Sequence, residues 1–300
     1  MSARPSNPAV QLDVIVTAMV ATPHSYVFRG EGNRLLQVGR VLAGSFTGRG
    51  EMLPSPCLAY VVRHPSAGAI LIDTGMHPDV DADLREDFGF AMSLLFRNLK
   101  PAQTPYEEAL RHLGVEPSEV ERVVMTHLHV DHTSGMRLLP NASFTVARRE
   151  WEIAQKPRAD TKGFISHHLP PESRVDPIDL PEGGEAHGPF ASTLDLLGDG
   201  SIRLISTPGH TPGHMSVLLR LAGGTQVLLV GDAAYTRRSI EEQILPLLTD
   251  NDDKYRATLT ELKRFTELEP DAIVVPSHDP TAWHQLRDVS QSAERAFTEA

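Results

Sequence analysis

Four short apolar runs of this sequence each end in a histidine or an aspartate, and this repeated arrangement constrains the fold more than any other feature. The runs are Val123–Met125, Ile202–Ser206, 227–230 and 272–275. Apolar runs of this length, bounded by Gly and Pro, predict buried strands. A loop that leaves a buried strand can aim several side chains at one point. The sequence therefore predicts a mixed α/β fold with a polar site where these strands end.

The first run leads into THLHVDH at 126–132, the strongest local signal in the chain. It places His127, His129, Asp131 and His132 within six residues. Imidazole nitrogens and carboxylate oxygens are ligands of Zn²⁺-type ions. Alternating ligands followed by an adjacent one suit two neighbouring metal centres better than one. The alternative, a polar surface loop with incidental histidines, does not explain this order of four ligand types.

The other three runs each add one candidate ligand. STPGHTPGH at 206–214 presents His210 on a Pro-Gly turn, whereas His214 leads into the next strand and is expected to be structural. VLLVGDAAY at 227–235 carries Asp232, which by itself could be only a turn residue. IVVPSHDP at 273–280 carries His278.

Composition limits the kind of site and the kind of partner. The chain has 14 His and one Cys, so a metal would be held by His and carboxylates, and Cys57 is expected to be a small core residue. The net charge of −11 argues against nucleic acid and against an anionic membrane as partners. The sequence shows no signal-peptide pattern and no apolar run long enough to insert in a membrane, so a cytoplasmic location is expected.

Strands and helices alternate without a dividing linker, which predicts a single two-layered α/β domain over 1–300 with a loosely ordered tail over about 1–12. Leu58–Arg63 and Ala69–Ile72 are expected to form a hairpin. Residues 156–190 look like a long surface excursion, in which His167 and His168 are expected at the surface. The expected helices span 82–98, 105–113, 148–155 and 252–268.

The order HLHVDH, TPGH, GD and SH, with IDTG at 72–75 before them, resembles the metallo-β-lactamase superfamily. The resemblance implies an αββα sandwich with a dinuclear metal site. It implies a first metal on His127, His129 and His210, a second on Asp131, His132 and His278, and Asp232 as the bridge between them. We expect two divalent ions, with zinc first and cobalt, manganese or iron also accepted by such ligands.

Within the superfamily, Asp232 and Tyr235 form a D-x-x-Y pattern that resembles the N-acyl-homoserine lactonases, which quench quorum sensing. The resemblance implies that a bridging hydroxide opens the lactone ring while the Tyr235 hydroxyl reaches the substrate carbonyl. Asp131 is the expected proton shuttle to the leaving oxygen. The alternatives are a thioesterase of the glyoxalase II type, a lactonase for another small ring such as pyridoxolactone, and a non-catalytic binding protein.

An acylated substrate needs an apolar groove, and the stretch DFGFAMSLLF at 87–96 is the best candidate for its wall. Phe88 and Phe96 are expected to contact the substrate, as is Val130 between the ligands. Leu245–Leu248 is a second possible wall. The alternatives for 87–96 are a helix buried on all sides and a homodimer interface.

Overall fold

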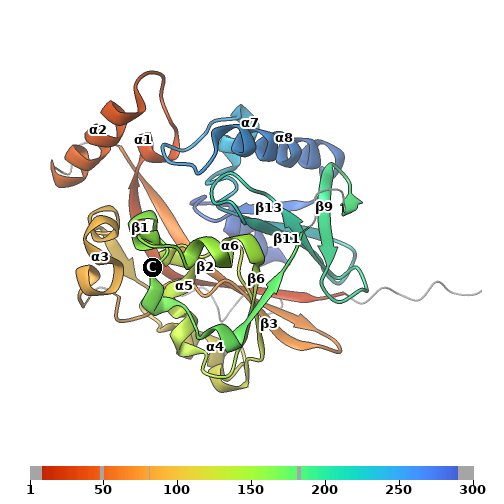
Figure 1. The fold of residues 1–300 in the computed structure, drawn as a ribbon. Coiled ribbons are helices and arrows are strands. Elements are labelled where there is room, and N and C mark those ends of the chain that lie inside the picture. Colours follow the sequence, from red (N-terminus) through yellow and green to blue (C-terminus); the bar gives the residue numbers. More distant parts are fainter. Residues whose placement is uncertain (1–8, 48–50, 81, 181–183, 290–300) are drawn as a thin grey trace, which may run out of the picture.

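Two β-sheets lie face to face in the computed structural model of the chain, and helices cover both outer faces (Figure 1). The structure describes residues 9–47, 51–80, 82–180 and 184–289. The strands of the first sheet span Gln11–Pro23 (β1), Met52–His64 (β2), Gly68–Ile72 (β3), Leu99–Pro101 (β4), Arg122–Val124 (β5), Ser143–Ala147 (β6) and Val175–Ile178 (β7). Those of the second span Glu185–His187 (β8), Phe190–Asp195 (β9), Ile202–Ser206 (β10), Met215–Arg220 (β11), Gln226–Gly231 (β12) and Ile273–Pro276 (β13).

The strand orders bring segments that are far apart in the sequence to one edge. Within the described residues, the first sheet runs β4-β1-β2-β3-β5-β6-β7 and the second runs β13-β12-β11-β10-β9-β8. β3, β5, β6 and β7 are parallel, as are β12 and β13, whereas the other neighbours are antiparallel. The loops that follow β3, β5, β10, β12 and β13 carry the motifs described above.

The core follows from the alternation of side chains along each strand. Val14 of β1 packs between the two sheets, whereas the next residue, Ile15, packs on the outer face of the first sheet. Leu229 of β12 also lies between the sheets, and its neighbour Leu228 packs against Leu259 on the outer face of the second. Burial on both faces explains why runs such as 14–16 of β1 and 227–230 of β12 are apolar without alternation.

The helices complete the four layers, with α4 on one outer side and α7 and α8 on the other (Figure 1). They span His24–Val27 (α1), Arg34–Thr47 (α2), Leu84–Leu95 (α3), Tyr106–His112 (α4), Val130–Thr133 (α5), Arg148–Ala154 (α6), Arg237–Glu242 (α7) and Asp252–Leu268 (α8). Short 3₁₀ turns span Pro117–Glu119, Ser134–Leu138, Ala159–Lys162, Ser166–His168, Glu172–Arg174 and Ala282–Asp288. Among the described residues, no helix is both long and apolar enough to cross a membrane.

The αββα fold class, the β2–β3 hairpin and the expected helices over 105–113, 148–155 and 252–268 are confirmed. The helix expected over 82–98 is present as α3, but Gly89, with φ of +71°, interrupts it with a kink. Two expectations need correction. The segment 156–190 is no mere surface excursion, because β7 extends the first sheet and β8 begins the second. The tail is shorter than expected, because β1 starts at Gln11 and Leu12 is buried; residues 1–8 lie outside the described residues. The assignment of 1–300 to one domain stays a prediction.

Candidate metal centre

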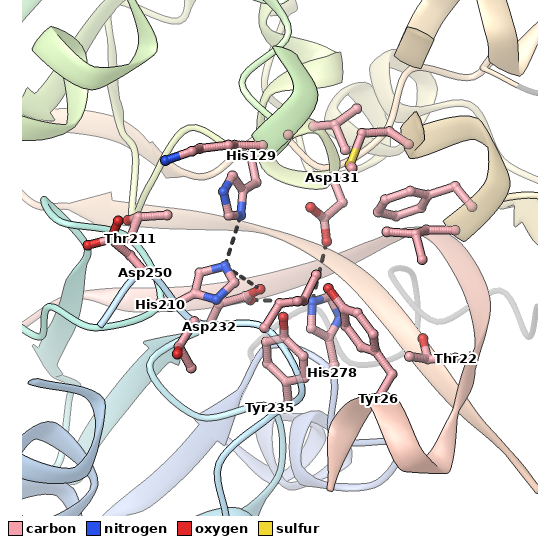
Figure 2. Close-up of a pocket in the computed structure, with 18 of the residues that line it drawn as sticks. Thr22, Tyr26, His129, Asp131, His210, Thr211, Asp232, Tyr235, Asp250 and His278 are labelled. Carbon is pink, nitrogen blue, oxygen red and sulfur yellow. Dashed lines mark hydrogen bonds and ion pairs between the residues drawn. The ribbon is translucent and has the colours of Figure 1, made fainter. Parts of the chain in front are cut away.

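The seven candidate ligands converge at one end of the two sheets, and Figure 2 labels His129, Asp131, His210, Asp232 and His278 among them. They form two groups, and within each group the ligand atoms lie within 4.8 Å of one another. One group is His127, His129 and His210, and the other is Asp131, His132, Asp232 and His278. The four segments that supply them, which follow β5, β10, β12 and β13, are far apart in sequence, so the sandwich itself builds the cluster.

Asp232 belongs to the second group but also lies next to the first. One of its carboxylate oxygens faces the histidines of each group. Its Oδ2 lies 3.3 Å from His210 Nε2 and 3.9 Å from His127 Nε2. Its Oδ1 lies 3.3 Å from both His132 Nε2 and His278 Nε2. A carboxylate in this position can contact two cations at once.

The residues fit a pair of divalent ions, because buried polar atoms at the centre lack other partners. Nε2 of His127, Nε2 of His132 and Oδ1 of Asp232 are buried and make no hydrogen bond of normal geometry to another described residue. Leaving such atoms unsatisfied costs about 1–3 kcal/mol each. Imidazole and carboxylate are the ligand types that Zn²⁺ and similar ions prefer.

Hydrogen bonds behind the cluster fix the orientation of two ligand rings. His132 Nδ1 donates to Asp73 Oδ2 at 2.8 Å, and His278 Nδ1 donates to the Pro56 carbonyl at 3.1 Å. In both rings the proton on Nδ1 leaves Nε2 to face the centre. Asp73, from the IDTG segment, also accepts from the Thr126 N–H at 2.8 Å and so holds the ligand loop itself.

His214 is excluded as a ligand because both of its ring nitrogens are occupied. The Asp232 N–H donates to His214 Nε2 at 3.0 Å, and His214 Nδ1 is hydrogen-bonded to Thr207 Oγ1 at 2.9 Å. Burial lowers the pKa of His214 to about 3, so the ring is a neutral acceptor. The structural role expected for His214 matches this geometry.

The turn that presents His210 depends on a glycine. Gly209 has φ of +135°, and a Cβ there would lie 2.4 Å from the Tyr255 backbone nitrogen of α8. Glycine alone permits both the backbone conformation and this close approach. The Pro-Gly pair of the motif is therefore a packing requirement as well as a turn.

The two groups differ electrostatically. Burial lowers the pKa of His129 to about 4 and the pKa values of His127 and His210 well below their usual range. Burial also opposes charge on His278, but Asp232 and Asp131 raise the pKa of its ring to about 10. The three-histidine group is thus ready to ligate, whereas the other group holds protons that a metal would displace.

A cavity of about 330 Å³ opens beside the cluster and is lined mainly by apolar side chains. The predicted contacts Val130 and Phe96 line it, as does Leu248 of the second expected wall. Phe88 of α3 is not among the residues that line the cavity. Its side chain is 1 % exposed, because its ring packs edge-on against the ring of Phe96. Substrate contact by Phe88 stays a prediction, which this burial does not favour. Other apolar lining residues are Val20, Met92, Leu95, Ile153, Phe164 and Pro212.

Two tyrosines face the cluster from the cavity side (Figure 2). The ring of Tyr235 lies 5.1 Å from the His278 ring and 5.7 Å from the His210 ring. Tyr26 of α1 stacks on Tyr235 at 6.1 Å and shares a hydrogen bond with it. Sequence reasoning missed Tyr26, because no motif surrounds it and only the docking of α1 brings it to the site.

A third group of His and carboxylate comprises Asp87, His167 and His168, and it is called the Asp87 cluster here. Asp87 Oδ1 lies 3.3 Å from His168 Nε2, 3.6 Å from His167 Nε2 and 3.1 Å from Arg137 Nη2. His167 is exposed as expected, but His168 is 2 % exposed, which corrects its expected place at the surface. It is buried because it packs against Phe88 and Asp87.

This chain is similar to several known proteins. The metallo-beta-lactamase superfamily model matches residues 52–278. An N-acyl homoserine lactonase, AttM of Agrobacterium fabrum, is 35% identical over 243 residues, which cover 80% of this chain and 88% of AttM. A solved N-acyl homoserine lactone hydrolase with N-hexanoyl-L-homoserine at its catalytic metal centre has a TM-score of 0.66 at 22% identity, covering 92% of this chain and 95% of that one. AidC, a dizinc quorum-quenching lactonase, has a TM-score of 0.59 at 15% identity, covering 90% and 88%. The chain belongs to the metallo-beta-lactamase superfamily.

Proposed function

We propose that this protein is a dinuclear metal-dependent hydrolase that opens the lactone ring of N-acyl homoserine lactones. The observation that carries the proposal is the position of Asp232, whose two oxygens face two separate sets of histidines beside an apolar cavity. The relationship to AttM supports the same activity, because AttM is named for it.

The metal-binding role of the cluster is part of this proposal. His127, His129 and His210 would hold one ion, and Asp131, His132 and His278 the other, with Asp232 shared between them. Bound divalent ions supply a Lewis acid for an ester carbonyl and lower the pKa of water toward about 7. We infer zinc in both positions from the ligand chemistry and from the dizinc neighbour.

The residues of the chain then orient the ester and move its proton. Tyr235 is buried beside the cluster, and burial raises the pKa of its hydroxyl well above the usual range, so it stays a hydrogen-bond donor. We assign it to the carbonyl oxygen, where negative charge develops as water adds to the carbonyl carbon. Asp131 Oδ2, 3.3 Å from His278 Nε2, would accept the proton that the attacking water loses and pass it to the ring oxygen as the C–O bond breaks.

The cavity explains the choice of an acylated substrate. Phe96, Met92 and Leu95 form an apolar wall from α3, and Phe164 faces the site from the segment after α6. An acyl chain buried here gains about 0.8 kcal/mol per methylene. The substrate class is therefore a small polar ring with an apolar tail. A cytoplasmic location and a homodimer stay predictions of the sequence.

A side-by-side assay tests the proposal. Purified zinc-loaded protein is given N-hexanoyl-homoserine lactone or S-lactoylglutathione, and proton release and thiol release are recorded. Proton release with the lactone, abolished in Asp232→Asn, is the expected result. Thiol release without lactone opening would replace the proposal with a thioesterase, and inactivity toward both substrates would refute it.

A further inference from the structure

Glu150 of α6 lies behind the metal centre, and its side chain is fully buried. Its Oε1 accepts a hydrogen bond from the Leu128 N–H at 3.1 Å. Its Oε2 accepts one from the Gly213 N–H at 2.9 Å. A single carboxylate therefore joins two loops that lie more than 80 residues apart in the sequence.

Both of these loops carry candidate metal ligands. Leu128 stands between His127 and His129, and Gly213 follows His210 by three residues. The ligand rings of the two loops meet in the three-histidine group, where His210 Nε2 lies 2.9 Å from His129 Nδ1. The distance between the loops thus sets the distance between the ligands.

The packing around Glu150 leaves little freedom for either loop. A Cβ at Gly213 would lie 2.4 Å from the Glu150 backbone nitrogen, so the second loop runs directly against the start of α6. On another side of the same two loops, the Met215 N–H donates to the Thr126 carbonyl at 2.9 Å. The loops are therefore held to each other directly and through Glu150.

Only a carboxylate suits this position. Two backbone N–H groups point at the side chain, and each needs an acceptor, because a buried N–H without one is costly. Both oxygens of a carboxylate accept, whereas glutamine offers one acceptor and one NH₂ group. Glutamine would place a donor against a donor at one of the two loops.

We propose that Glu150 is a positioning residue for the metal centre, which sets the spacing between the loop of His127 and His129 and the loop of His210. The inference rests on the proposed function in one respect, that the cluster binds metal. Glu150 contacts no candidate ligand side chain in this arrangement and acts through the backbone of Leu128 and Gly213.

Zinc affinity of Glu150→Gln tests the proposal, measured by competition with a chromophoric zinc chelator. Loss of a group that orients metal ligands from behind typically lowers affinity about 10- to 100-fold, and we expect a loss of that size here. Glu152→Gln is the matched control, because Glu152 is exposed on the same helix, and its affinity should equal that of the wild type. Glu150→Asp keeps two acceptor oxygens and should recover part of the loss.

Two further measurements separate positioning from general destabilisation. Leu110→Ala removes a buried side chain of α4, a helix that supplies no candidate ligand, so it should lower stability without lowering the zinc affinity of the folded protein. In the wild type, hydrogen exchange at the Leu128 and Gly213 amides should be slow. This second measurement remains informative if Glu150→Gln does not fold.

The outcomes are decisive for both proposals. If the wild type binds zinc and folded Glu150→Gln binds it equally well, the positioning role is wrong and the proposed function stands. The role is also wrong if Leu110→Ala loses as much affinity, or if the two amides exchange as fast as exposed ones. If the wild type binds no zinc, the metal centre of the proposed function fails, and this inference fails with it.

Discussion

Two clusters of histidine and carboxylate occur in this molecule, and they differ in what surrounds the carboxylate. At the metal centre, the ion-pair partners of Asp232 among the described residues are imidazole nitrogens, and its Oδ1 is buried without a hydrogen bond of normal geometry to another of these residues. In the Asp87 cluster, the same oxygen that faces His168 also lies 3.1 Å from the Arg137 guanidinium. A bound cation at that oxygen would be opposed by a fixed positive charge.

The comparison teaches that residue type and spacing do not suffice to define a metal site. The Arg137 guanidinium supplies the positive charge that a metal ion would supply. We therefore interpret the Asp87 cluster as a group of ion pairs that holds separate segments of the chain together, called the joint below. It ties α3 to the segment after α6, and both line the cavity, α3 through Leu95 and the later segment through Phe164. The following predictions test this distinction.

The largest effect is expected from Asp232→Asn. Loss of the shared carboxylate should reduce bound metal below two ions per chain and lower kcat/KM by about 10³-fold or more, since metal-derived stabilisation amounts to several kcal/mol. Elemental analysis and lactone hydrolysis are the measurements. Asp87→Asn, the same change in the other cluster, should keep both ions and most of the activity. The distinction between the two clusters is wrong if Asp87→Asn also loses metal, or if the wild type holds a third ion.

Tyr235→Phe should lower kcat by about 10²- to 10³-fold, because it removes one donor to the developing oxyanion. Metal content should stay at the wild-type value, since Tyr235 is no ligand in this arrangement. Tyr106→Phe is the control, because Tyr106 is the first residue of α4 and its hydroxyl is buried without a hydrogen-bond partner among the described residues. Steady-state kinetics that are unchanged in Tyr235→Phe would remove its assigned role.

Asp87→Asn should instead lower the free energy of unfolding by about 1.5–3 kcal/mol, the range for hydrogen bonds to charged groups. The loss follows because Arg137 and His168 keep their positions but lose the charge that they face. Denaturant unfolding of the metal-free protein measures it. Equal stability of the two proteins would show that the joint contributes nothing.

The ion pairs of the Asp87 cluster also predict how the stability of the protein depends on pH. Burial opposes ionisation of Asp87, but His168, Arg137 and His167 lower the pKa of its carboxyl to about 2. A lowered pKa in the folded protein stabilises it above about pH 4, and this contribution disappears as the pH falls toward 2. The stability difference between wild type and Asp87→Asn should therefore shrink by about 1–2 kcal/mol over that interval. A difference that stays constant with pH would contradict the ionised state of Asp87.

The smallest effect concerns the cavity wall. Each methylene of a bound acyl chain is worth about 0.8 kcal/mol, or about fourfold in kcat/KM. Phe96→Ala should reduce this increment, measured across substrates of increasing chain length. Phe88→Ala should leave the increment closer to the wild-type value and lower stability instead, because Phe88 is buried outside the cavity lining. The reverse pattern would mean that Phe88 contacts the chain.

The sequence alone determined a mixed α/β fold and the candidates for the metal centre, and its resemblance to the metallo-β-lactamase superfamily implied the αββα class. The first two depend on short-range patterns: an apolar run defines a buried strand, and the residues just after it must leave the strand at a fixed place. For this reason His127, His210, Asp232 and His278 could be selected without knowing how the strands pair.

The tertiary structure alone decided the relations between distant segments. It turned the two oxygens of Asp232 to different histidines, brought Tyr26 to Tyr235, and buried Phe88 while Phe96 reached the cavity. It also placed Glu150 between two ligand loops. Such contacts depend on how sheets and helices pack, and the same local sequence pattern is compatible with many packings. Only the folded chain decides whether a buried carboxylate lies against a guanidinium, as Asp87 does, or against a set of imidazoles, as Asp232 does.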